Sequence, residues 1–270
     1  MKANMKKLMT SVAVAASLGF AANANASIYD INIDLFDSTT AQGVTDYAND
    51  SLGVFSEFQD TVAPITILGG YRDLIVSTAS GSSVVDEYGT KLKVLSTGGL
   101  SFSNDDGVKG TGIVQWDGGD NSANLGMGLG NLDLSGKNQF EATVGHADVG
   151  FSYTIGVYTS ATKYSTLTSG ALFGVDNYTT SWLFDWFQLA AGDHTEGGLP
   201  FTIAWGDDGA VDFSHVNAIE LMLTNDFDGG TVSLDMNIKT VKAVPEPASM
   251  ALVGLGLMGL AGLRRRKLPV

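Results

Sequence analysis

Hydrophobic and polar side chains alternate with a period of two along much of the chain after residue 28. In 29–35 the odd positions carry Tyr, Ile, Ile and Leu, and the even positions carry Asp, Asn and Asp. The same alternation recurs in 140–144, 149–157 and 232–238. Because successive side chains of a strand point to opposite faces, the pattern predicts half-buried β-strands. We expect the second and third segments to form a hairpin around a turn at 145–148, and 232–238 to be the last strand.

Shorter apolar runs separated by turn residues occupy most of the remaining chain. These strand-like runs are 72–78, 92–96, 100–103, 113–116, 181–189, 200–205 and 218–224. Clusters of Gly, Asn and Asp separate them, and no amphipathic helix, fixed-period repeat or low-complexity linker interrupts the pattern. The pattern is typical of an all-β protein, and it predicts one antiparallel β-sandwich or jelly roll over residues 27–243.

The first 26 residues have the three parts of a secretory signal. Three lysines precede an apolar run at 8–22, and Ala24 and Ala26 then form a small-x-small cleavage site. We therefore expect a helical signal peptide at 1–26 that signal peptidase removes, with Ser27 as the mature N-terminus. The alternative is an uncleaved membrane anchor, which the shortness of the apolar run disfavours.

The C-terminal residues 244–270 form a second distinct segment. Val244, Pro245, Glu246 and Pro247 are followed by an uncharged apolar stretch at 248–263 and then by Arg264, Arg265, Arg266 and Lys267. The prolines keep the start of the tail extended. A helix of sixteen residues reaches about 24 Å, short of the roughly 30 Å hydrocarbon core, so the segment is marginal as a permanent span. The basic cluster favours the cytoplasmic side, which places the body outside.

Pro-Glu-Pro, a short Gly/Leu-rich hydrophobic helix and an Arg cluster, in that order, resemble the PEP-CTERM sorting tail. This tail is found on exported proteins of Gram-negative bacteria that also make exopolysaccharide. The resemblance implies recognition by an exosortase, transient contact of 248–263 with the inner membrane, removal of the tail near Pro-Glu-Pro, and delivery to the cell surface or extracellular matrix. The alternative is a simple tail anchor.

The charge of the body excludes one class of partner. The chain has a net charge of −14, but the segment 27–243 holds eight basic and 28 acidic residues, a formal charge of −20. Such a body repels phosphate backbones, which excludes a nucleic-acid partner. The chain has no cysteine, so disulfides and thiolate chemistry are excluded as well.

Four tryptophans are candidates for glycan contact, because the apolar faces of sugar rings stack on indoles. They are Trp116, Trp182, Trp186 and Trp205. Trp182 and Trp186 are evenly spaced, so on a strand they share a face with Phe184, and core packing explains such a stripe equally well. The segment 212–221, with the strand ending at 238, resembles the closing strands of galactose-binding-like jelly rolls, which implies carbohydrate binding as a possible function.

Acidic turns suggest calcium as a possible cofactor. The candidates are Asp105, Asp106, Asp226 and Asp228, since calcium prefers several oxygen ligands. None of these turns has the spacing of an EF-hand, and Asp-Gly turns are common in β proteins. The three histidines, His146, His194 and His215, lack the spacing of a zinc site.

The sequence favours a non-catalytic surface or matrix protein associated with exopolysaccharide. It contains no nucleophile elbow, phosphate loop or Cys/His couple, so we predict no enzymatic activity. Two alternatives remain: a carbohydrate-binding module, and a polysaccharide hydrolase, which needs only two carboxylates at a suitable separation.

Overall fold

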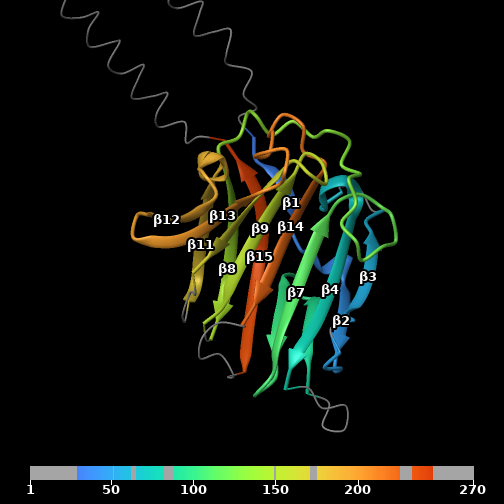
Figure 1. Cartoon of the computed structure of the whole chain (residues 1–270). Coiled ribbons are helices and arrows are strands. Elements are labelled where there is room, and N and C mark those ends of the chain that lie inside the picture. Colours follow the sequence, from blue (N-terminus) through green and yellow to red (C-terminus); the bar gives the residue numbers. More distant parts are fainter. Residues whose placement is uncertain are drawn as a thin grey trace, which may run out of the picture.

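The computed structural model describes residues 29–50, 52–61, 65–81, 88–148, 150–170, 175–225 and 233–245. These residues form two antiparallel β-sheets packed face to face (Figure 1). The predicted fold class, an all-β antiparallel sandwich, is confirmed. The signal peptide at 1–26 and the hydrophobic helix at 248–263 lie outside the described residues. Within the described part of the chain, no helix combines the length and the apolar character required to cross a membrane.

One sheet has seven strands in the order β11-β8-β15-β6-β5-β2, with β1 paired to β15. Their bounds are β1 Ile31–Asp34, β2 Gln42–Asp46, β5 Thr90–Val94, β6 Leu100–Asn104, β8 Gln139–Ala147, β11 Val175–Leu183 and β15 Leu234–Val244. The strand β15 lies at the centre of this sheet and pairs with β8, β6 and β1.

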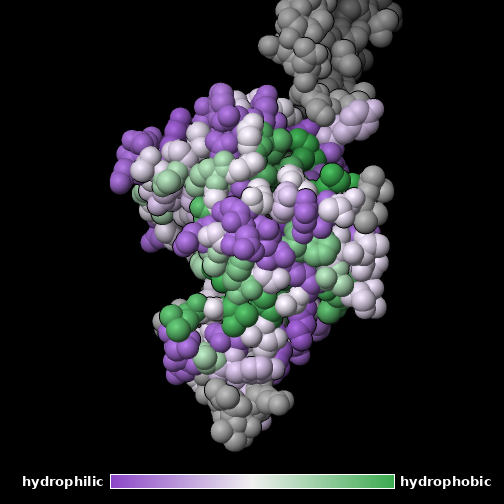
Figure 2. Space-filling view, turned by 90° about the vertical axis from the view of Figure 1, so that its right-hand side faces the viewer, coloured by the Kyte–Doolittle hydropathy of each residue, from purple (hydrophilic) through white to green (hydrophobic). Residues whose placement is uncertain are grey.

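The other sheet has eight strands in the order β12-β13-β10-β9-β14-β7-β4-β3. Their bounds are β3 Val54–Gln59, β4 Tyr71–Ser80, β7 Lys109–Trp116, β9 Ser152–Tyr158, β10 Tyr164–Ser169, β12 Gly192–Glu196, β13 Leu199–Trp205 and β14 Ala218–Thr224. Three short 3-10 helices complete the described elements: η1 Ser38–Thr40, η2 Leu68–Gly70 and η3 Phe184–Gln188. Figure 2, which views the molecule from the side of β3, shows small groups of hydrophobic residues between hydrophilic ones.

The hydrophobic core lies between the two sheets. In β8 the buried side chains alternate with exposed or half-buried ones, and Phe140, Ala142 and Val144 face the core. From the opposite sheet, Val114 of β7 and Ile155 of β9 face the same interior. The period-two pattern therefore records which face of each strand is covered by the other sheet.

A buried ion pair crosses the core beside β1. The Arg72 guanidinium is 2.9 Å from the Asp34 carboxylate, and both side chains are fully buried. Arg72 also donates to the Thr40 carbonyl and to the Gln42 side chain. Asp34 accepts further hydrogen bonds from the Phe36 N–H and the Trp116 Nε1–H. The buried charges of Arg72 and Asp34 are therefore both paired and hydrogen-bonded.

The predicted hairpin of 140–144 with 149–157 is wrong. The strand β8 continues through the expected turn to Ala147, and it belongs to the seven-stranded sheet. The strand β9 belongs to the other sheet, where it pairs with β10 and β14. Both strands bury one face, but they do so from opposite sides of the core, and periodicity alone cannot distinguish that from pairing.

The strand predicted over 181–189 is correct only in its first part. The strand β11 ends at Leu183, and the chain turns into the 3-10 helix η3. Phe184 and Phe187 are the buried residues of that helix, and their spacing of three matches one turn of a 3-10 helix. Trp182 and Trp186 therefore do not share the face of a single strand.

Candidate functional site

The C-terminal tail begins where the last strand ends. Val244 is the final residue of β15, lies opposite Gln139, and accepts a hydrogen bond from the Asn138 N–H through its carbonyl. Pro245 follows and lacks the N–H that a further ladder bond would need. The predicted site residues Ala24, Ala26, Ser27, Glu246, Pro247, Arg264, Arg265 and Arg266 lie outside the described residues.

Two of the four candidate tryptophans are core residues. Trp116 is fully buried, donates its Nε1–H to Asp34, and packs against Phe36. Trp182 is buried edge-on against Tyr153, with ring centroids 5.0 Å apart. Their indole faces contact the protein interior, which is the core-packing alternative considered for the tryptophan stripe.

Trp186 and Trp205 are half-buried, and only Trp186 of these two lines a pocket. Trp186 stacks on Phe201 with centroids 4.9 Å apart and planes inclined by 23°. The pocket has a volume of about 260 Å³ and lies between β11 of one sheet and β10 and β13 of the other. Its wall combines aromatic rings with hydroxyl groups, and it brings together two of the predicted tryptophans, Trp182 and Trp186. The other residues of this kind are Tyr153, Tyr178, Thr180, Ser181 and Phe201.

Of the four residues predicted as calcium candidates, one has other partners, one is exposed in a turn, and two are not described. Asp105 forms an ion pair with Lys91 and accepts a hydrogen bond from the Gly89 N–H, so it fastens the turn between β6 and β7 to the start of β5. Asp106 is exposed in the same turn. Asp226 and Asp228 lie outside the described residues.

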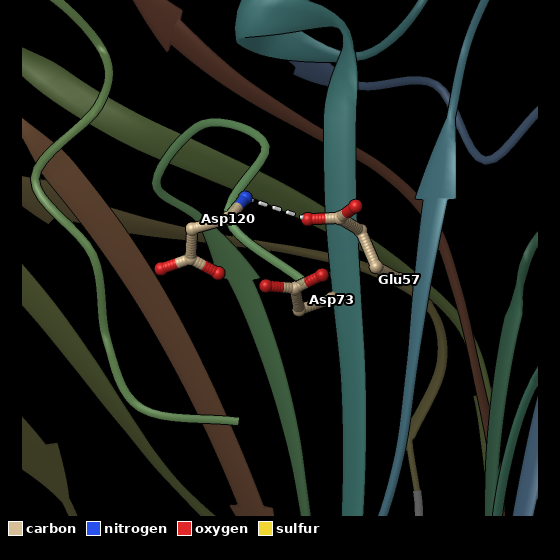
Figure 3. Close-up of side chains that lie close together, drawn as sticks. All are labelled: Glu57, Asp73 and Asp120. Atoms are coloured by element: carbon tan, nitrogen blue, oxygen red, sulfur yellow. Dashed lines mark hydrogen bonds between the residues drawn. The ribbon is translucent and has the colours of Figure 1, made fainter. Parts of the chain in front are cut away.

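The structure instead brings together carboxylates that the sequence did not associate. Carboxylate oxygens of Glu57, Asp73 and Asp120 lie within 4.8 Å of one another. Figure 3 shows the three side chains converging from β3, from β4 and from the loop after β7. Asp117, the first residue of that loop, lies close enough to raise the pKa of Asp73.

Two carboxylates at this site have raised pKa values. Burial, together with the negative charges of Asp117, Glu57 and Asp120, raises the pKa of Asp73 to about 8. Burial likewise raises the pKa of Asp117 to about 6, although a hydrogen bond from the Gly126 N–H opposes this shift. Clusters that perturb pKa values by burial and like charge are candidates for functional sites.

Comparison with known proteins identifies the tail. Residues 243–267 match the PEP-CTERM protein-sorting motif, which confirms the resemblance noted in the sequence. No curated protein matches the chain.

Two solved structures align with most of the chain at low sequence identity and low TM-score. A family 11 carbohydrate-binding module of the cellulosomal cellulase Lic26A-Cel5E of Clostridium thermocellum matches over 81% of this chain and 96% of its own, with 9% identity and a TM-score of 0.39. The module CBM27-1 of Caldicellulosiruptor saccharolyticus, solved with mannohexaose, matches over 82% of this chain and 100% of its own, with 15% identity and a TM-score of 0.32. The strand pairing of the chain itself and the matched tail show an antiparallel β-sandwich joined to a PEP-CTERM protein-sorting motif that begins as the last strand ends.

Proposed function

We propose that this protein is a non-catalytic cargo of the exosortase pathway, exported, trimmed at its C-terminus and retained at the cell surface or in the exopolysaccharide matrix. The observation that carries the proposal is the position of the sorting motif. It covers 243–267, whereas β15 ends at Val244 and its last carbonyl is hydrogen-bonded to Asn138. Cleavage after Pro245 would leave every described strand complete, so the tail can be removed without unfolding the body.

The test is the C-terminal sequence of the protein recovered from the envelope of a host that carries an exosortase. We expect mass spectrometry to find the wild-type C-terminus near residues 245–247. Replacing Pro245, Glu246 and Pro247 together by alanine should leave the tail attached. Pro200→Ala is the matched control, because it also removes a proline but lies in β13. A mature protein that retained the Arg cluster, or equal processing of the triple variant, would refute the proposal.

Carbohydrate binding is a second candidate function, favoured by the pocket beside Trp186. An aromatic wall with neighbouring hydroxyl groups suits the apolar face and the hydroxyls of a sugar ring. In affinity electrophoresis through soluble polysaccharides, including exopolysaccharide from the host, we expect Trp186→Ala to weaken retardation at least tenfold. Trp205→Ala provides the control, since Trp205 is also half-buried but does not line the pocket. Lack of retardation of the wild type, or equal effects of both substitutions, would exclude this function for the pocket.

A further inference from the structure

Four carboxylates, those of Glu57, Asp73, Asp117 and Asp120, form an acidic group at one end of the neighbouring strands β3, β4 and β7. The register of these strands brings the group together. Glu57 of β3 lies opposite Asp73 of β4, and Asp73 lies opposite Gln115 of β7, so the three side chains form one row on the outer face of the eight-stranded sheet. Asp117 follows two residues after Gln115, where strand alternation returns to the same face. The next loop then brings Asp120 over this row. Like charges on directly opposite residues destabilise a sheet unless something compensates them.

Within the described residues, Asp73 has no partner and no basic side chain compensates the charge of the group. Asp73 is 0% exposed, and neither of its carboxylate oxygens has a hydrogen-bond partner. Across the described ranges, no basic side chain forms an ion pair with any of the four carboxylates. A buried and unpartnered carboxylate is costly in every protein, and here it points toward Glu57 and Asp120 (Figure 3).

The hydrogen bonds at the site occupy one oxygen of each surrounding carboxylate. Glu57 accepts the N–H groups of Asp120 and Asn121 on Oε2, Asp120 accepts the Ser122 N–H on Oδ1, and Asp117 accepts the Gly126 N–H on Oδ2. These bonds fix the carboxylates and leave the second oxygen of each without a described hydrogen bond. With both oxygens of Asp73, five carboxylate oxygens remain, and the buried Gln115 Oε1 beside them also lacks a donor.

The loop that carries Asp117 and Asp120 is shaped for close approach. A Cβ atom at Gly126 would lie 2.6 Å from Asp120 Oδ2 and 3.2 Å from Asp117 Oδ2. A side chain at this position would push against both carboxylates, so the glycine allows the loop backbone to lie close to them. Gly118 has a φ of +92°, a left-handed conformation that turns the chain back over the sheet directly after Asp117.

We propose that Glu57, Asp73, Asp117 and Asp120 bind one calcium ion, which fastens the loop at 117–126 to β3 and β4. The chemistry favours calcium because all of the available donors are oxygens and because calcium accepts six to eight of them in irregular geometry, with water completing the shell. Magnesium requires a near-ideal octahedron, and zinc prefers nitrogen or sulfur ligands, which the group does not supply. The site is distinct from the sorting tail and from the pocket beside Trp186, so it does not depend on the proposed function.

The test is calorimetric titration of the full chain, stripped with EGTA and then titrated with calcium chloride or magnesium chloride. We expect one calcium ion per chain and at least tenfold weaker binding of magnesium. At a calcium concentration of 100 times Kd, the thermal midpoint should rise by about 5–10 °C.

Two substitutions and one control make the test specific. Asp120→Asn should weaken calcium binding at least tenfold, and because Asp120 is exposed this variant should fold. Asp73→Asn should abolish the calcium-dependent rise of the midpoint. Asp106→Asn removes the same charge from an exposed turn outside the group and should bind calcium like the wild type. The proposal is overturned if millimolar calcium gives no heat and no shift, if magnesium binds as tightly, or if Asp120→Asn and Asp106→Asn behave alike.

Discussion

Replacing Arg72 should be among the most damaging single changes in the core. Arg72→Met keeps an apolar stem between the Phe36 and Phe58 rings but removes the guanidinium that now lies 5.7 and 5.6 Å from their centroids. Asp34 would then be a buried carboxylate without its countercharge, and the Thr40 carbonyl would lose its 2.7 Å hydrogen bond. Removing one partner of a buried ion pair typically costs about 3–5 kcal/mol, and we expect a loss of unfolding free energy of that size.

The assay is urea denaturation followed by tryptophan fluorescence, with Trp116 beside the substituted pair as a reporter. The decisive comparison is the double variant Arg72→Met/Asp34→Asn. Asparagine removes the buried charge and can still accept from the Phe36 N–H, but its NH2 group cannot accept from the Trp116 Nε1–H. Because a lost neutral hydrogen bond costs less than an unpaired buried charge, the double variant should be more stable than Arg72→Met alone by at least about 1 kcal/mol. Lys91→Met is the control, since it breaks a partly exposed ion pair and should cost less than about 1 kcal/mol. A loss below 1 kcal/mol for Arg72→Met, or a double variant less stable than the single one, would refute the reasoning.

Three further predictions concern single side chains. Ser165→Ala should cost roughly 1–3 kcal/mol in urea denaturation, because the buried hydroxyl donates to the Phe187 carbonyl and accepts from the Val211 N–H; a loss no larger than that of the half-buried control Ser101→Ala would contradict this. Gly110→Ala should lower the unfolding free energy by about 1–3 kcal/mol, because the new Cβ would lie 1.8 Å from Thr90 Oγ1. In the control Gly43→Ala the new Cβ meets only the flexible Lys93 side chain, so the loss should be smaller. Equal urea midpoints for the two variants would contradict this prediction. With calcium chelated, the unfolding free energy should fall as pH rises from about 4 to about 8. Asp73 has a pKa of about 8 when folded and near its usual 3.8 when unfolded, so the folded state binds one more proton over that range. The pH dependence of the urea midpoint should flatten in Asp73→Asn, and an unchanged slope would contradict the assignment.

The strands that could be predicted are those whose alternation matches burial. The strand β14 has the predicted bounds, and β8 and β15 were found through the same period-two pattern. Other strands carry little of this signal. The strand β12 has the sequence GDHTE and is mostly exposed, so hydrophobicity does not mark it, and β10 buries Ser165 where the pattern requires an apolar residue. Their place in the sheet is set by backbone pairing with β13 and β9, which no local pattern reports.

The acidic group was missed for a related reason. Glu57, Asp73 and Asp120 are far apart in the sequence, and they meet only because β3, β4 and β7 are neighbours in one sheet. The strand β3 was not predicted, since its side chains are mostly half-buried and show no contrast between faces. Two local signals are present: an Asp directly before the apolar run 74–76 of β4, and Asp117 and Asp120 flanking two glycines directly after β7. Neither signal identifies its partner without the register of the strands.

The central position of β15 has a consequence for the order in which the protein can fold. The strand is the last described one along the chain, yet it joins β8 to β6 and also pairs with β1, the first described strand. Until β15 is in place, the seven-stranded sheet has a gap in its middle and two unprotected strand edges. Closing it requires contacts between opposite ends of the chain, a topology that slows folding. The sorting motif follows immediately, so the seven-stranded sheet can close only when the whole body up to the start of the tail is free to fold.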